Sequence, residues 1–69
     1  MSTMIVTANG DEIEVHEGAT VADLLEQLGL GKRVLVVERN GDPVPRDARD
    51  STGLRAGDRL ELVRAVAGG

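Results

Sequence analysis

The chain ends in two glycines, Gly68 and Gly69, directly after a segment with the pattern of a β-strand, LELVRAVA. Glycine has no Cβ, so a glycine tail can enter a narrow channel and leaves its carbonyl carbon unhindered. If the tail is presented to the α-phosphate of ATP, its carboxylate is a nucleophile. The attack gives an acyl-adenylate, from which AMP can leave. We therefore expect Gly69 to be the reacting position and Gly68 to belong to its tether.

No other residues have the spacing of a catalytic or metal site. His16 is the single histidine, and it stands among acids on a strand face that we expect to be exposed. Ser51 and Thr52 have no base placed to activate them, and we interpret them as turn or capping residues. Gly29 and Gly31 do not match a glycine-rich phosphate loop. We expect a chain that is not itself an enzyme, with no bound metal or cofactor.

The composition predicts one small cytoplasmic domain. The chain has 69 residues, no cysteine, no aromatic residue and a net charge of −4. Without aromatic side chains or positive charge, it lacks the stacking surfaces and the phosphate attraction that nucleic-acid binding uses. No apolar run approaches the ~20 residues that span a membrane, and no signal-peptide pattern opens the chain. We expect neither nucleic acid nor membrane as a partner.

The charges are unevenly distributed. The first 31 residues carry six acids and no base, a net charge of −6, whereas the remaining residues carry eight bases and six acids, a net charge of +2. The two values sum to the total of −4. A solvated surface is the simpler explanation, and an oriented docking face is the functional alternative. For docking, the candidate contact residues lie at the end of the chain, and their charge favours an acidic patch on the partner: Arg59, Val63, Arg64, Ala65 and Val66.

The stretch MIVTANGDEIEVH predicts a β-hairpin. Asn9 and Gly10 suit a type I′ turn, because both of its central residues need a positive φ. In that register, Val6 faces Ile13, and apolar residues oppose each other on one buried face. The remaining expected pairs are Ala8 with Asp11 and Met4 with Val15, while Glu12, Glu14 and His16 fall on the other face.

The stretch GATVADLLEQLGLG predicts a helix. Thr20 is a good N-cap, and Asp23 three residues later can complete a capping box. Gly29 suits the left-handed position after the helix, with Leu30 as the apolar contact of a Schellman motif. The apolar stripe has the spacing i, i+3, i+4, i+7, which is typical of a helix that covers a core: Val21, Leu24, Leu25 and Leu28.

The rest of the chain predicts three more extended segments. Residues 33–38 form a valine-rich buried strand, and an Asn-Gly turn leads to an edge segment that contains Pro43 and Pro45. Residues 46–58 form a loop with one helical turn, from which Leu54 enters the core. A final strand follows and loosens its alternation after Leu62, through a bulge or because the strand leaves the core. The element order requires a crossover through the helix.

This order predicts an α+β, ubiquitin-like β-grasp fold. We expect a mixed sheet of four to five strands, with one main helix packed across it. We also expect one β-grasp domain over residues 1–67 and a flexible Gly-Gly tail at residues 68–69.

The hairpin, EGATVADLLEQLGL, NGDPVPR, LRAGDRLELV and the ending AVAGG together resemble the ThiS family, the sulfur carriers of bacterial thiamine biosynthesis. The resemblance covers residues 4–69. It implies that Gly69, with Gly68 beside it, is adenylated by a ThiF-like enzyme and converted to a thiocarboxylate by a sulfur donor protein. The sulfur then passes to a thiazole synthase of the ThiG type, and ATP is used by the adenylating partner.

Two other interpretations stay open. Small sulfur carriers of molybdopterin or cysteine synthesis also use a Gly-Gly end. This tail, however, lacks the proline that often precedes the glycines in the molybdopterin group. The stretch IEVHEGATVADLLEQLG also resembles β-grasp ligand-binding modules of the TGS type. Such a module has no need of a free Gly-Gly end.

Overall fold

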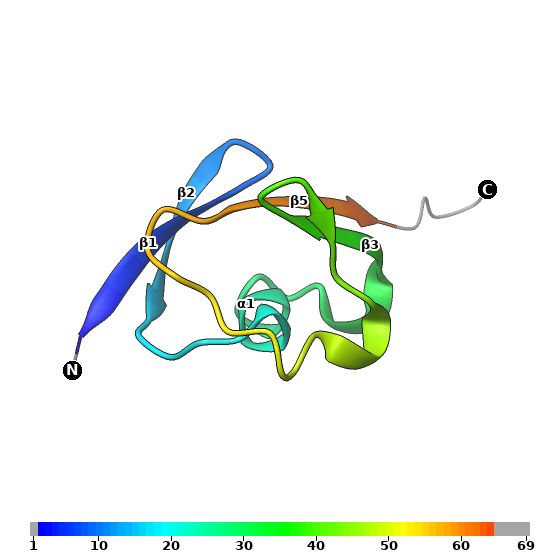
Figure 1. Ribbon diagram of the computed structural model, residues 1–69, viewed down its shortest axis with the longest axis horizontal. Helices are drawn as coiled ribbons and strands as arrows, with labels where there is room; N and C mark the ends of the chain where they lie inside the picture. Colours follow the sequence, from blue (N-terminus) through cyan, green and yellow to red (C-terminus); the bar gives the residue numbers. More distant parts are fainter. Residues whose placement is uncertain (1, 65–69) are drawn as a thin grey trace.

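A computed structural model describes residues 2–64 of the chain, with the backbone alone at residues 32 and 35. Within this part the chain forms one α-helix, two 3-10 helices and five strands (Figure 1). Their order is β1 (Thr3–Ala8), β2 (Asp11–His16), α1 (Val21–Gln27), η1 (Gly31–Arg33), β3 (Val34–Arg39), β4 (Asp42–Pro43), η2 (Arg46–Ala48) and β5 (Arg59–Arg64). None of these helices is long and apolar enough to cross a membrane.

The five strands form one mixed sheet in the order β2-β1-β5-β3-β4. The last strand, β5, lies in the centre, parallel to β1 and antiparallel to β3. Helix α1 lies under one face of the sheet and leaves the other face open (Figure 1). This is the predicted β-grasp arrangement, with the sheet at the upper end of the expected strand number.

The hairpin register is confirmed. Val6 pairs with Ile13, and Met4 pairs with Val15. The turn residue Asn9 has φ of 50° and Gly10 has φ of 87°, the positive values that a type I′ turn requires. A slip of one strand by one residue would turn its core-facing apolar side chains to the open face, so the alternation specifies this pairing.

Both ends of α1 have the predicted caps. The Thr20 hydroxyl accepts from the N–H of Asp23 at 3.2 Å, and the Asp23 carboxylate accepts from the N–H of Thr20 at 3.0 Å. Gly29 has φ of 73°. The N–H of Gly29 donates to Glu26 and that of Leu30 to Leu25, both at 2.9 Å, which completes the Schellman motif.

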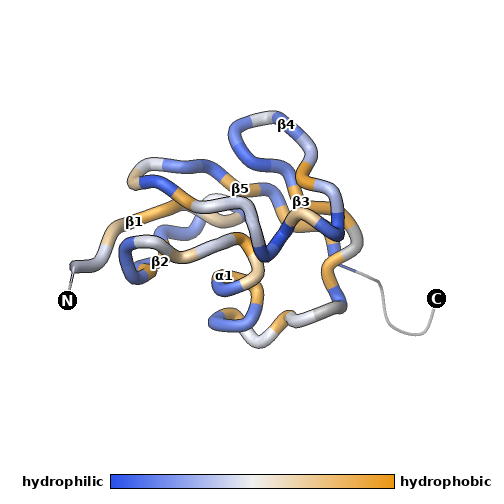
Figure 2. Tube along the Cα trace, turned by 60° about the horizontal axis from the view of Figure 1, so that its bottom comes forward, coloured by the Kyte–Doolittle hydropathy of each residue, from blue (hydrophilic) through white to orange (hydrophobic). Residues whose placement is uncertain are grey.

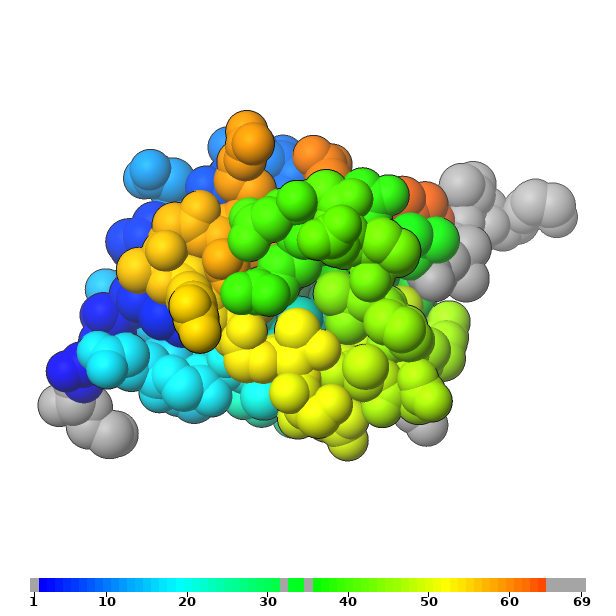
Figure 3. Space-filling model, viewed as in Figure 1, coloured from blue at the N-terminus to red at the C-terminus, as the bar shows by residue number. Residues whose placement is uncertain are grey.

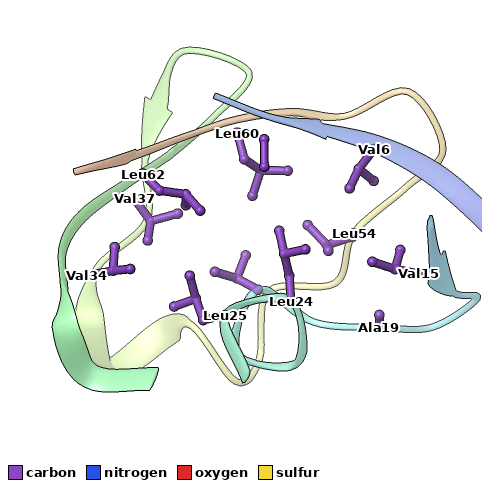
Figure 4. Packing of buried hydrophobic residues seen from close by; sticks show 12 residues of the cluster. Val6, Val15, Ala19, Leu24, Leu25, Val34, Val37, Leu54, Leu60 and Leu62 are labelled. Carbon is purple, nitrogen blue, oxygen red and sulfur yellow. The ribbon is translucent and has the colours of Figure 1, made fainter. Parts of the chain in front are cut away.

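The core lies between α1 and the sheet. Figure 4 shows side chains from the helix and from β1, β3 and β5 pointing toward one another. Leu24 is fully buried, and Leu54 reaches the core from the loop after η2, as predicted. Figure 2 shows hydrophobic segments along the strands and hydrophilic ones at the turns. The buried apolar residues are Val6, Ala8, Val15, Ala19, Val21, Leu24, Leu25, Val34, Val37, Leu54, Leu60 and Leu62.

Two predicted details need adjustment. Strand β3 runs from Val34 to Arg39, one residue later than expected, because residues 31–33 form a 3-10 turn. The expected irregularity near the end of β5 is a bulge in the neighbouring strand, since consecutive residues of β5 pair with Val34 and Val36. The predicted last residues of the final strand, 65–67, and the predicted tail at 68–69 lie outside the described residues.

Candidate functional site

Strand β5 leads toward the predicted Gly-Gly tail. Leu60 is 2% exposed and Leu62 is 7% exposed, so both anchor the strand in the core. The strand ends at Arg64, away from the end of the molecule where β1 begins (Figure 1). Strand β5 pairs with β1 on one side and with β3 on the other, so its first residues are held from both sides. The predicted positions Ala65, Val66, Gly68 and Gly69 lie outside the described residues.

The open face of the sheet carries an exposed pair of valines near the end of β5. Val63 is 52% exposed, and Val36 of β3 is 44% exposed. The two residues pair directly across the strands. In the space-filling view, the last described residues of β5 reach the surface next to the β3–β4 segment (Figure 3). The pair therefore forms a small apolar patch just before residues 65–69.

Two carboxylates lie next to this patch. Glu38 of β3 and Glu61 of β5 are directly opposed, and like charges in that position repel each other. Within residues 2–64, neither carboxylate has a salt bridge or a side-chain hydrogen bond. Sequence reasoning missed this arrangement, because neither glutamate has a local signal for its cross-strand neighbour.

The structure brings together only some of the predicted contact residues. Side chains alternate along a strand, so Arg59 shares the open face with Glu61 and Val63. By its position in the strand, Arg64 lies on the same face as the core leucines. It is nevertheless exposed, because the covered part of the sheet ends before it. The open face therefore carries both signs of charge, and Arg64 lies at the edge of the candidate surface.

The side chain of Asn9, which directly follows β1, is hydrogen-bonded to β5. The carboxamide of Asn9 accepts from the N–H of Leu62 at 2.8 Å and donates to the carbonyl of the same residue at 3.1 Å. From the sequence, Asn9 was expected only as a turn residue. Its contact to β5 had no signal of its own, since 53 residues separate the partners.

The start of β5 is fixed by a buried carboxylate. Asp58 accepts from Arg39 Nε at 2.8 Å, from the N–H of Arg55 at 2.8 Å and from the Asn40 amide at 3.0 Å. Burial acts to raise the pKa of this carboxyl, but the three hydrogen bonds and the charge of Arg39 outweigh it and hold the pKa below its ordinary value. Asp58 is thus ionised and locks the turn that precedes β5.

The other candidate groups have structural roles. His16 is exposed, with its Nε2 3.8 Å from Asp23. The hydroxyls of Ser51 and Thr52 both donate to the carbonyl of Ala48, as expected for turn residues. Across residues 2–64, no group of three or more histidine or acidic side chains is arranged to hold a metal.

A broad open hollow lies between α1, η1 and η2. Its volume is about 780 Å³, and its lining includes Ala22, Leu25, Glu26, Arg46, Asp47 and Asp50. Acidic and basic side chains mix at its rim, so it favours no single class of ligand.

Known proteins are similar to this chain in both sequence and fold. A family model described as the ThiS family matches residues 3–69. A thiazole synthase of Paramagnetospirillum magneticum is 36% identical over 66 residues, which are 96% of this chain and 20% of that relative. The chain thus spans about a fifth of the length of this curated relative.

Two solved structures have the same fold. The crystal structure of the thiamine biosynthesis protein ThiS from Geobacter metallireducens is 34% identical, with a TM-score of 0.77 over 96% of this chain and 100% of that one. The solution structure of the HVO 2177 protein of Haloferax volcanii is 27% identical, with a TM-score of 0.70 over 97% of this chain and 88% of that one. With the β-grasp fold, the central final strand and a family match that includes both terminal glycines, this chain belongs to the ThiS family.

Proposed function

We propose that this protein is a sulfur carrier of thiamine biosynthesis, with the sulfur held as a thiocarboxylate on Gly69. One observation carries the proposal: the ThiS family match extends through Gly68 and Gly69, and the strand that leads to them is the central strand of the sheet. The similarity to the Geobacter metallireducens protein, which is named for thiamine biosynthesis, supports the pathway.

The proposed chemistry takes place at the carboxylate of Gly69. One carboxylate oxygen attacks the α-phosphorus of ATP, a new P–O bond forms, and pyrophosphate leaves. The resulting acyl-adenylate has AMP as a leaving group. A nucleophile at the oxidation level of sulfide, supplied by the sulfur donor, then attacks the carbonyl carbon, and the C–O bond to AMP breaks, which leaves a thiocarboxylate and free AMP. The chain supplies the carboxylate, while the partner enzymes supply ATP and the active sites.

The proposed partners are a ThiF-like adenylyltransferase, a sulfur donor protein and a ThiG-like thiazole synthase. The relative named thiazole synthase contains a segment similar to this chain within one longer polypeptide, which supports a partnership with that activity. The contact is proposed to involve Arg59, Val63 and Arg64 on the described part of β5, and Ala65 and Val66 after it. Val36 joins this surface, because it lies opposite Val63.

Intact-mass measurement tests the proposal. The purified chain that ends at Gly69 is incubated with a ThiF-like adenylyltransferase, ATP and a sulfur donor. We expect a mass increase that corresponds to the replacement of one oxygen by sulfur, and we expect none without ATP. An unchanged mass, with a partner shown to be active on another carrier, would contradict the proposal. Thiazole formation with the loaded chain then separates this pathway from molybdopterin or cysteine synthesis.

A further inference from the structure

The pairing between β1 and β5 is short. It consists of Thr7 with Arg59 and Ala8 with Leu60, and it ends where the hairpin turn begins. One backbone bond continues it, from the N–H of Asn9 to the carbonyl of Leu60 at 2.9 Å. Past this point the backbone of the turn leads away into β2, so the β1 side of β5 has no further strand beside it.

The side chain of Asn9 takes the place of the missing strand residue. A carboxamide has a carbonyl oxygen and an NH2 group, so it can accept and donate at once, as a peptide unit does. In Asn9 the oxygen accepts from the N–H of Leu62 at 2.8 Å, and the amide nitrogen donates to the carbonyl of Leu62 at 3.1 Å. Both backbone groups of Leu62 on that side are therefore satisfied, and the ladder continues by one step.

The part of β5 that is held from both sides ends at the same residue. Leu62 is 7% exposed, whereas the next residue, Val63, is 52% exposed. On the other side of β5, the pairing with β3 becomes irregular between Val34 and Val36. Leu62 is thus the last residue of β5 that is buried, paired in regular register with β3 and bonded from the β1 side.

We propose that Asn9 is a positioning residue that sets where the tail leaves the fold, and thereby the reach of the Gly69 carboxylate. This inference rests on the proposed function. From Leu62 to Gly69 there are seven residue steps (69 − 62), and a fully extended chain of that length spans at most about 23–25 Å. If the two hydrogen bonds between Asn9 and Leu62, here called the Asn9 clamp, are lost, the last hold on the β1 side moves back to Leu60. Residues 61–64 of β5 are then held by β3 alone, so the end of the strand is less ordered before the partner binds the tail.

Substitutions at Asn9 can separate the clamp from the turn. Asn9→Gly keeps a residue that accepts the observed φ of 50° and removes the carboxamide. Asn9→Asp keeps the acceptor for the N–H of Leu62 but places a carboxylate oxygen against the Leu62 carbonyl. A matched control is Asn40→Gly at the other Asn-Gly turn. Asn40 has φ of 54°, and its side chain accepts from the N–H of Arg59 at the start of β5.

Amide hydrogen exchange measured by NMR tests the clamp in the free chain. In Asn9→Gly, we expect the Leu62 amide to exchange faster by about fivefold or more relative to the Leu24 amide, as for the loss of one hydrogen bond. In Asn40→Gly, the ratio of the two rates should stay as in the wild type. An unchanged ratio in Asn9→Gly overturns the inference. This measurement needs no partner, so it stands apart from the proposed function.

Adenylation kinetics test the consequence for the tail. We expect Asn9→Gly to raise the KM for the carrier by roughly threefold to tenfold, because the end of β5 is then held from one side only and must be ordered on binding, and to leave kcat nearly unchanged. Asn9→Asp should also raise KM, and Asn40→Gly should not. Equal increases in both glycine variants would indicate general loosening and overturn the positioning role. No adenylation of the wild type would contradict the proposed function, while the exchange ratio would still decide the clamp.

Discussion

Val36 and Val63 lie directly opposite each other on β3 and β5, and they are 44% and 52% exposed. A single exposed apolar residue is ordinary on a protein surface, but this pair lies at the end of β5, from which the tail proposed to enter a partner continues. We predict that Val63→Ser weakens binding to the adenylyltransferase by about tenfold, since burial of a valine contributes about 1.5 kcal/mol or more. Isothermal titration calorimetry measures this directly.

The control is Ile5→Ser. Ile5 is 44% exposed on the same open face, but it lies on β1, which is on the other side of β5 from Val36. Both substitutions should leave the free energy of unfolding within about 0.5 kcal/mol of the wild type, as for exposed sites. If Ile5→Ser weakens binding as much as Val63→Ser does, the contact is not centred on the valine pair.

Two charge-reversal substitutions of opposite sign test the charge of the partner's contact surface. If the partner presents an acidic patch, Arg64→Glu should slow association, and Glu61→Lys should speed it. Both effects should be larger at low salt than at high salt, because exposed charges are screened. Stopped-flow association rates at several salt concentrations measure this. A faster rate for Arg64→Glu would reverse the sign of the inferred patch, and no salt dependence would mean that the uneven charge is only solvated surface.

Local sequence signals were enough for most of the fold. The Asn9-Gly10 turn and the alternation around it predicted the hairpin register, because the two signals agree on one pairing. The caps of α1 followed from Thr20 and Gly29 in the same way. Each of these signals operates within a few residues, so it needs no knowledge of which strands become neighbours.

The missed features depend on contacts between distant segments. The Asn9 clamp on Leu62 requires β1 and β5 to be adjacent, and the opposition of Glu38 and Glu61 requires the register of β3 with β5. That register includes a bulge near Val36 within a uniform apolar run, where no glycine or polar residue marks the extra position. Strand alternation alone therefore could not place the surface beside the tail.

Truncation of the fully buried Leu24 should destabilise the domain strongly. Leu24→Ala removes a side chain that is 0% exposed at the centre of the core, and we expect a loss of about 2–5 kcal/mol. In a domain of 69 residues, this is a large part of the total stability. Urea unfolding followed by circular dichroism measures it. Glu26→Ala on the exposed side of the same helix is the control, and equal losses in both variants would contradict the assignment of the core.

The ionised Asp58 should make the free energy of unfolding depend on pH in the acid range. Its pKa in the folded chain lies below the ordinary value of 3.8. Its contribution is therefore fully present above that pH and is lost as the pH falls through the folded pKa. We predict that Asp58→Asn costs about 2 kcal/mol near neutral pH, where hydrogen bonds to a charged group are lost. The difference from the wild type should shrink as the pH falls below 3.8.

Denaturant unfolding at neutral pH and at acid pH gives both values for Asp58→Asn. The matched control is Asp50→Asn, because Asp50 is exposed and its side chain has no salt bridge or hydrogen bond within residues 2–64. A difference between Asp58→Asn and the wild type that stays constant from neutral to acid pH would show that the ionised carboxylate is not the stabilising group.

The chemistry proposed at the tail makes two further variants informative. One residue added after Gly69 would move the reacting carboxylate by about 3.3–3.6 Å along an extended chain, beyond the position that attacks ATP. We therefore expect this extended chain to show no ATP-dependent mass change. Gly69→Ala keeps the length but adds a Cβ beside the reacting carbon, so activation should slow while the unfolding midpoint stays the same. Full activation of the extended chain would rule out the Gly69 carboxylate as the reacting group, since that carboxylate is then part of a peptide bond.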